Sequence, residues 1–551
     1  MLPKRNIHEL ISILRKDCKR VLKMHAPGFP RPYYCSFLLK DTNWFNTWAS
    51  SGSTYRRRSD HTRNVYCDIR VGSYRFDQVT DGGLLDNDDE RFSYNYIRVP
   101  IDDKDHDGLR LGLWRLSEAK FREALSDFSD RKASGLSTVD SNKRFPSFTK
   151  AKAVRSIRYK RPQRVDEDRW VRFCKSASKW LSEFKQVSGN YVEFDSSRAT
   201  QIFVNTEGSV VVQHSQIFSL FANMRKLTKE GIQIEQDVVY HASTLSDLPD
   251  MRTFKRACLR KYNRLCELIK ARTVHSFSGP VLLYPQPAGL LFHEAIGHRL
   301  EGSRLLSSGE GQTFKGHVGR RVIGADVTVR DDPTLKKFEG WSCVGYFDYD
   351  DEGIPAQNTL LVENGVLKEF LSTRAGLKPR GHQSNGHART RKHQRPISRM
   401  GVTIVEPGEE AYSLPELKEK LIELIRESKS PFGMIVYETT GGETDTTSYD
   451  FQAFAGEISY ATLVYPSGRE EVIKGVDFVG TPLAALGNIV AVGSDLELDN
   501  SYCGAESGFL PVSTISPAML IKNLELQAKD EELVTPYILP KPRLSRRNRR
   551  K

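Results

Sequence analysis

Residues 289–302 read GLLFHEAIGHRLEG, and this stretch decides how the second half of the chain is organised. His293 and Glu294 are followed, after three intervening residues, by His298. Neutral imidazole nitrogens bind Zn²⁺ well, and catalytic zinc sites leave one coordination position for water or substrate. A carboxylate beside the first ligand can accept a proton from that water. We therefore interpret His293 and His298 as metal ligands and Glu294 as a general base.

The spacing of the two histidines differs from the common metalloprotease motif H-E-x-x-H, whose histidines share one face of a regular helix. His293 and His298 are five residues apart, which separates them by about 140° around a helix axis. Both can reach one metal ion only if the helix widens locally, as in a π-bulge, or ends near Gly297. We expect Gly297 to ease that departure, because glycine tolerates irregular backbone. The alternative is a regular buried helix whose histidines form hydrogen bonds.

The residues that precede the motif predict a rigid support for it. Residues 279–292, GPVLLYPQPAGLLF, contain an apolar run, a proline-rich turn and the start of an apolar helix. This order predicts a buried strand followed directly by the helix that carries His293. Side chains on such regular elements are held more firmly than side chains on loops.

Length and composition indicate a soluble globular protein of more than one domain. The chain has 551 residues, of which 38% are hydrophobic and 27% charged. No stretch approaches the roughly 18 apolar residues of a membrane-spanning helix, and residues 1–20 lack the features of a signal peptide. The eight cysteines are scattered without a C-x-x-C pair, which favours a reducing compartment. We predict a cytoplasmic protein without membrane association.

Basic residues are concentrated in two places. The formal net charge is +13, and seven of the Lys and Arg residues lie in residues 540–551, PKPRLSRRNRRK. Such a tail can bind nucleic acid or an anionic membrane, but it is also typical of a disordered, solvated end, which we predict for residues 536–551. Residues 378–399 place three histidines, at 382, 387 and 393, among Arg and Lys. This stretch can bind a carboxylate or a phosphate, or form a solvated loop.

The first half of the chain shows alternating helical and extended patterns. We predict helices over residues 6–23, 108–132, 166–184 and 248–271. We predict strands over residues 33–40 and 64–72, and a meander over 191–221 with turns at 195–197 and 206–209. None of these segments carries a recognisable chemical constellation, so residues 1–275 are interpreted as an α+β scaffold or substrate-recruiting domain.

The second half, residues 276–535, is predicted to be a β-rich domain that carries the metal-binding helix. It is punctuated by glycines, and it contains two hairpin signals. Asn364-Gly365 is a typical type I′ turn pair between apolar residues, and residues 464–472 surround a Pro-Ser-Gly turn. The chain as a whole is therefore assigned to the α+β class.

Several further motifs of the second half occur in a fixed order. After the histidine motif with Glu301-Gly302 come DDEG, ENG, NGHAR, DTTS, VGSDLELDN and CGAESGFLPVS, which begin at residues 350, 363, 385, 445, 492 and 503. With these motifs, residues 279–526 resemble the TldD/PmbA family of zinc metallopeptidases, in the branch that carries the H-E-x-x-x-H motif. Residues 1–275 resemble the family only in their rhythm of strands and helices.

The resemblance implies a third metal ligand that spacing alone does not identify. Metal sites of the family combine the two motif histidines with a cysteine in a glycine-rich segment, a position that matches Cys503. Thiolate and imidazole together suit Zn²⁺. The alternative for Cys503 is a small buried apolar residue. The resemblance also implies that Asn385 and Arg389 lie at the catalytic cleft and contact substrate. We further expect Glu301 to orient a ligand histidine.

Together these inferences predict a zinc-dependent peptidase that hydrolyses unfolded or short peptides. The resemblance implies a dimer that encloses its active site, formed either by two identical chains or with a motif-lacking relative. Two other functions stay open: a zinc hydrolase of a non-peptide amide, and a nucleic-acid-associated binding protein that uses residues 378–399 and the tail. The intact set of His293, Glu294 and His298 argues against a purely structural role, and we do not expect nucleic acid among the partners.

Overall fold

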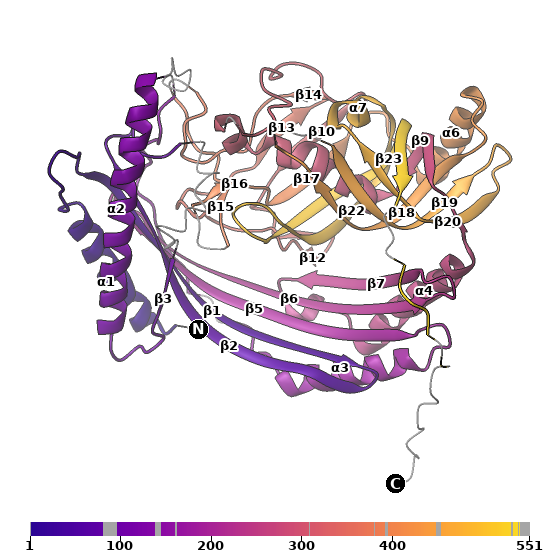
Figure 1. The fold of residues 1–551 in the computed structure, drawn as a ribbon, viewed down its shortest axis with the longest axis horizontal. Coiled ribbons are helices and arrows are strands. Elements are labelled where there is room, and N and C mark those ends of the chain that lie inside the picture. Colours follow the sequence, from indigo (N-terminus) through magenta and orange to yellow (C-terminus); the bar gives the residue numbers. More distant parts are fainter. Residues whose placement is uncertain are drawn as a thin grey trace, which may run out of the picture.

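Two large β-sheets, one in each half of the chain, organise the protein (Figure 1). The computed structural model describes residues 2–80, 96–137, 145–159, 162–307, 309–378, 381–391, 395–447, 453–529, 533–537 and 539. The α+β class is confirmed, as are the β-rich second half and its motif-bearing helix. The domain boundary at residue 275 stays a prediction, and residues 540–551 lie outside the described residues.

The sheet of the first half has the strand order β3-β2-β1-β5-β6-β4, with β7 paired to β6. Most of its strands are long and antiparallel. Their bounds are β1 Pro32–Ser50, β2 Ser53–Val71, β3 Tyr96–Val99, β4 Arg155–Ile157, β5 Gly189–Asn205, β6 Val210–Leu227 and β7 Gln233–Ala242.

The predicted turn at residues 195–197 is wrong, because β5 continues through it and pairs with β1 and β6 on either side. The polar residues that suggested a turn are used within the sheet. The carboxylate of Asp195 accepts hydrogen bonds from Trp44 Nε1, at 2.5 Å, and from Asn46 Nδ2, at 3.4 Å. Strands β1 and β2 likewise extend well beyond their predicted apolar ends. Asp41 of β1 is paired with Arg63 of β2 and forms a buried ion pair of 2.8 Å with it, so the two strands can continue through these charged residues.

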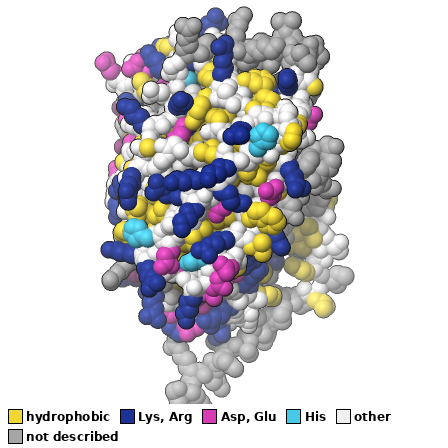
Figure 2. All heavy atoms as spheres, turned by 90° about the vertical axis from the view of Figure 1, so that its left-hand side faces the viewer, with side chains coloured by type: hydrophobic (Ala, Val, Ile, Leu, Met, Phe, Trp, Pro, Cys, Tyr) yellow, Lys and Arg dark blue, Asp and Glu magenta, His cyan; other side chains and the backbone are white. Residues whose placement is uncertain are grey.

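Four helices cover one face of this sheet: α1 Lys4–Val21, α2 Asp107–Ser137, α3 Glu167–Ser182 and α4 Met251–Lys270. Strand side chains alternate between faces. The alternate residues Phe37 and Phe45 of β1 both pack against these helices. Trp44 points to the other face, over which the second half lies (Figure 1). The outer surface at the α1 and α2 end is rich in Lys and Arg (Figure 2), among them the exposed Arg15 and Lys19.

The sheet of the second half contains twelve described strands, and β23 lies near its centre with β17, β9, β21 and β22 as neighbours. The bounds of its strands are β8 Arg272–Thr273, β9 Ser276–Leu283, β10 Val327–Asp331, β13 Thr359–Glu363, β14 Val366–Leu367, β17 Val402–Pro407, β18 Gly433–Thr444, β19 Phe454–Val464, β20 Glu470–Lys474, β21 Val476–Gly480, β22 Ile489–Cys503 and β23 Leu510–Ala528. Two short hairpins, β11 Lys337–Phe338 with β12 Trp341–Ser342 and β15 Ala388–Arg389 with β16 Ile397–Ser398, stand apart from it. Helices α5 Pro285–Phe292, α6 Leu414–Glu427 and α7 Pro482–Gly487 complete this half.

Two local predictions for the second half are confirmed by the backbone. The chain turns between β13 and β14 at Asn364 and Gly365, whose φ angles of 46° and 79° are those that a type I′ turn needs. Strand β9 leads directly into α5, as residues 279–292 predict, but the expected proline-rich turn is instead the first turn of the helix, which begins at Pro285. A Cβ added at Gly289 would lie 2.8 Å from Ser516 Oγ, so this glycine lets α5 lie directly on β23.

The two halves are joined by buried polar contacts. The guanidinium of Arg374, which is 1% exposed, donates to the carbonyl oxygen of Thr149 and to the carboxylate of Glu207, both in the first half. It also lies 4.0 Å from the ring centre of Phe148. Among the described residues, no helix is both long enough and apolar enough to cross a membrane.

Candidate metal centre

The helix that carries the motif widens at the predicted place. Helix α5 passes into a π-helical turn at His293–Gly297 and then into a 3-10 turn at His298–Leu300. The amide of His298 donates to the carbonyl oxygen of His293, five residues back. This wider turn places both imidazoles on one side of the backbone, with ring centres 5.0 Å apart. The π-helical turn therefore allows two histidines five residues apart to reach the same site.

The prediction that Gly297 is needed for an irregular backbone is wrong. Its φ and ψ angles, −55° and −60°, are helical values that any residue can adopt. A Cβ at this position would instead lie 2.0 Å from the sulfur of Met400, a side chain that is 1% exposed. Glycine is therefore needed here for close packing, not for backbone freedom.

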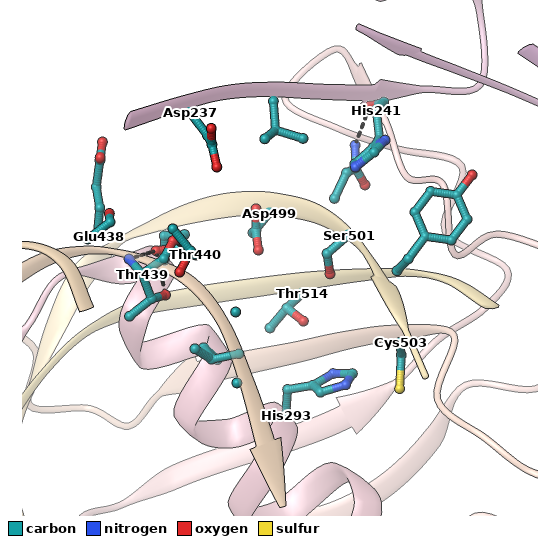
Figure 3. A pocket seen from close by; sticks show the side chains of 18 of the residues that line it. Asp237, His241, His293, Glu438, Thr439, Thr440, Asp499, Ser501, Cys503 and Thr514 are labelled. Carbon is teal, nitrogen blue, oxygen red and sulfur yellow. Dashed lines mark hydrogen bonds between the residues drawn. The ribbon is translucent and has the colours of Figure 1, made fainter. Parts of the chain in front are cut away.

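Cys503 lies beside the two histidines although 205 residues separate it from His298. It is the last residue of β22, and β22 pairs with β23, on which α5 rests. The ligand atoms of His293, His298 and Cys503 all lie within 4.8 Å of one another, and the three residues are buried. Figure 3 shows the sulfur of Cys503 next to the ring of His293.

The surroundings of Cys503 favour its thiolate. Its sulfur lies 3.2 Å from His298 Nε2 and accepts a hydrogen bond of 3.0 Å from Nη2 of the buried Arg399. Burial alone would raise the pKa of the Cys503 thiol, but His298, His293 and Arg399 hold it well below its ordinary value. The thiolate is the form of cysteine that binds a metal ion.

Glu301 holds the ring of His298 from the other side. Its Oε1 accepts from Nδ1 of His298 at 3.1 Å, and its Oε2 accepts from Nε of Arg304 at 2.9 Å. Burial alone would raise the pKa of Glu301, but His298 and Arg304 lower it to about 2. Burial alone would lower the pKa of His298, but Cys503 and Glu301 raise it to about 10. With Nδ1 turned to Glu301, Nε2 of His298 faces the sulfur.

Glu294 differs from Glu301 in having free oxygens. No described residue donates a hydrogen bond to its carboxylate, although the residue is only 5% exposed and lines a cavity. Burial raises its pKa above the ordinary value of a glutamate. Both oxygens can therefore receive a proton or a hydrogen bond from a molecule in the cavity.

The cavity has a volume of about 1390 Å³ and lies between the two halves of the chain. The second half contributes the motif residues and β18, β22 and β23, whereas β7 and α4 of the first half form the opposite wall (Figure 3). Asp237 and His241 of β7 and Asp499 of β22 line it. Asp499 belongs to the VGSDLELDN motif, but the sequence assigned it no role. Asp237 and His241 were not singled out, because alternation along β7 gives a face of a strand but not what lies across from it.

Asn385 and Arg389 do not line this cavity. Asn385 accepts from the amide of Ser372 and donates to the carbonyl oxygen of Phe370, and Arg389 donates to the carbonyl oxygens of Met400 and Pro511. Their polar groups are thus used to hold backbone. This geometry favours a supporting role over the substrate contact that the resemblance implied.

The basic stretch at residues 378–399 is only partly exposed where the structure describes it. His387 is 0% exposed and Arg389 7% exposed, and His382 is also buried, whereas Lys378 and Arg391 are exposed. The buried groups offer no surface to a nucleic acid, so they give the nucleic-acid hypothesis no support. His393, Arg380 and Lys392 lie outside the described residues.

The donor set fits the zinc ion that the sequence implied. Two imidazole nitrogens and a thiolate are common zinc ligands, and a soft sulfur donor disfavours Mg²⁺ or Ca²⁺. Carboxylates that hold the second nitrogen of a ligand histidine are typical of zinc sites, and Glu301 stands in that position.

Comparison with known proteins agrees with this geometry. Residues 276–528 match the PmbA/TldA metallopeptidase C-terminal domain. The chain is 30% identical over 334 residues to a metalloprotease of Methanothermobacter thermautotrophicus, an alignment that covers 61% of this chain and 68% of that protein. The chain belongs to the PmbA/TldD family of metallopeptidases.

This chain is also similar to two further proteins. It is 28% identical over 265 residues to the zinc metalloprotease TldD homolog of Saccharolobus solfataricus, covering 48% of this chain and 54% of that protein. The crystal structure of TldE from Thermococcus kodakarensis superposes with a TM-score of 0.62 at 14% identity, over 95% of this chain and 100% of that one. This second similarity shows a shared fold.

Proposed function

We propose that this metallopeptidase uses a Zn²⁺ ion held by His293, His298 and Cys503 to hydrolyse unfolded or short peptides. The observation that carries the proposal is the convergence of these three buried ligand atoms within 4.8 Å at the wall of a large cavity, beside a glutamate to which no described residue donates a hydrogen bond. A zinc ion bound there would acidify a water molecule and polarise the scissile carbonyl group.

The protein's own residues would divide the remaining work. Glu294 would take a proton from the attacking water, because its carboxylate is adjacent to a ligand and has no other partner among the described residues. Glu301 would keep the ring of His298 in one orientation through Nδ1. Arg399 would hold the sulfur of Cys503 in its charged form.

The size of the cavity supports a peptide as the substrate. Pockets for small molecules typically measure about 300–1,000 Å³, and this cavity exceeds that range at about 1390 Å³. Its two walls come from different halves of the chain, so a substrate would lie between them. The same metal chemistry would also suit a non-peptide amide, which the experiment below separates from a peptide.

Two wider features of the prediction are kept as proposals. We propose a dimer that encloses the cavity, formed by two copies of this chain or with a motif-lacking relative, and light scattering on the chain alone and on mixtures tests it.

We also propose a cytoplasmic location. All eight cysteines are free, and the thiolate proposed as a ligand needs reducing conditions.

The test combines metal analysis with mass spectrometry of a peptide library and a panel of small amides. We expect about one zinc ion per chain and cleavage of peptides. Glu294→Gln is expected to keep the metal and the fold but to lower turnover by at least ~10²-fold, as loss of a general base does. A zinc-loaded Glu294→Gln protein with normal turnover would remove Glu294 from the mechanism. Cleavage of the amides alone would reject a peptidase.

A further inference from the structure

The charge of the cavity is opposite to that of the whole chain. The formal net charge of the protein is +13, and Lys and Arg crowd its outer surface at the α1 and α2 end (Figure 2). The described residues that line the cavity include eight Asp or Glu but only four Lys or Arg. Three of those four bases are already paired. Lys261 and Arg264 contact Glu438, and Arg304 is bound by Glu301, Glu310 and Glu506.

One of the acidic side chains, Asp499, lines the cavity and has no hydrogen-bond or ion-pair partner among the described residues. Asp499, Ser501 and Cys503 alternate along β22, so their side chains point to the same side of the strand. Figure 3 shows Asp499 above His293, with its carboxylate on the side of β22 that faces His293. No described residue donates a hydrogen bond or forms an ion pair with its carboxylate. Burial raises its pKa to about 6, and only His293 opposes this.

Asp499 is partly exposed, so its carboxylate is open to a molecule that enters the cavity. His293 cannot neutralise Asp499 while it serves as a metal ligand, since a ligand imidazole is uncharged. The wall opposite presents Asp237 of β7, whose pKa is likewise raised by burial and which accepts one hydrogen bond, from Asn223. It also presents Arg260 of α4, which forms no ion pair with any described residue. One such base does not offset the acidic lining, so a positively charged group on a substrate would balance Asp499.

We propose that the cavity selects peptides that carry a positively charged nitrogen near the scissile bond, and that Asp499 binds this nitrogen. The inference rests on the proposed peptidase function and names its substrate class. Four residues of β22 separate Asp499 from Cys503, a distance of about 13 Å along a strand, or about four residues of an extended peptide. The cationic group is therefore placed within about four residues of the bond that is cut.

The experiment measures binding of fluorescent peptides to the full chain loaded with zinc in the Glu294→Gln form, so that the peptide stays intact. The peptides are N-acetylated and differ only in carrying Lys, Gln or Glu at one position. We expect Lys to bind at least ~10-fold more tightly than Gln, because a hydrogen bond to a charged group is worth that much. Glu peptides are expected to bind more weakly still. A second arm compares free and acetylated N-termini, which distinguishes an N-terminal amine from a side chain.

Two variants assign the preference to Asp499. Asp499→Asn is expected to reduce the preference for Lys to less than ~3-fold while its zinc content stays unchanged. Asp495→Asn removes an exposed carboxylate of the same strand that does not line the cavity, and it is expected to leave the preference intact. An unchanged preference in Asp499→Asn would overturn the proposal, and so would loss of zinc, which would place Asp499 at the metal instead.

If Asp499→Asn fails to fold, the proposal is tested by the salt dependence of the wild-type preference for Lys over Gln peptides. An electrostatic preference is expected to shrink at about 0.5 M salt, and a preference that salt leaves unchanged would count against the proposal. Hydrolysis by the wild-type chain separates this inference from the proposed function. Cleavage without any preference for cationic peptides would overturn the inference alone. Preferential binding without cleavage of any peptide would overturn the proposed function.

Discussion

Replacing Glu301 by glutamine is the sharpest test of how the metal centre is supported. Glu301 is 1% exposed, and its carboxylate contacts His298, Arg304 and Arg399 at 3.1, 2.8 and 3.3 Å. Glutamine has nearly the same shape, but it brings no charge and only one oxygen acceptor. The ring of His298 would lose its negative partner, and the two arginines would lose a shared counter-charge.

Two magnitudes follow from these contacts. Removing a carboxylate that holds a ligand histidine typically lowers metal affinity by about 10–100-fold. Breaking a buried ion pair costs about 3–5 kcal/mol. We expect the lower end here, about 3 kcal/mol, because Arg304 keeps Glu310 and Glu506, and Arg399 keeps backbone acceptors at Cys503 and Gly508.

The assay is competition with a chelator for zinc, together with chemical unfolding of the metal-free protein. Glu294→Gln is the matched control, since it also neutralises a buried glutamate seven residues away, but one to which no residue in the described part of the chain donates a hydrogen bond. We expect Glu301→Gln to lose zinc affinity and stability, whereas Glu294→Gln loses only turnover. If both variants bind zinc equally tightly and unfold alike, the orienting role of Glu301 is refuted.

Three further predictions concern other parts of the structure. Cys503→Ser is expected to weaken zinc binding by more than ~100-fold, which is more than the loss of a residue that only supports a ligand would cause. The control Cys18→Ser, in the core of the first half, is expected to keep its zinc. Equal metal content in the two variants would exclude Cys503 as a ligand. Gly297→Ala is expected to destabilise the fold by about 1–2 kcal/mol through its clash with Met400. The double variant with Met400→Ala should cost less than the sum of the single changes by at least ~0.5 kcal/mol in urea unfolding, and strict additivity would contradict the clash. Arg374→Met is expected to lower the free energy of unfolding by about 3 kcal/mol, the lower end of the range for a broken buried ion pair, because Glu207 loses its cation but keeps hydrogen bonds from Tyr74 and Asn205. A change below ~1 kcal/mol would show that this contact does not hold the two halves together.

What the sequence alone determined was local. The five-residue spacing of His293 and His298 required a widened turn, because the geometry of a helix is fixed, and a π-helical turn is present there. Asn364 and Gly365 predicted their turn because few residue pairs tolerate two positive φ angles. The ordered motifs identified the family, since relatives conserve short segments even where the overall chains differ.

Only the tertiary structure decided which distant residues meet. Cys503 approaches His298 because β22 pairs with β23 and β23 supports α5, a chain of contacts set by strand register. Asn385 and Arg389 turn inward to backbone carbonyls, because buried backbone groups must be satisfied, and no sequence pattern states which carbonyls those are. The opposite wall of the cavity, formed by β7 and α4, arises from the packing of one half on the other. Local periodicity gives the face of an element, but what that face meets depends on contacts between residues hundreds of positions apart.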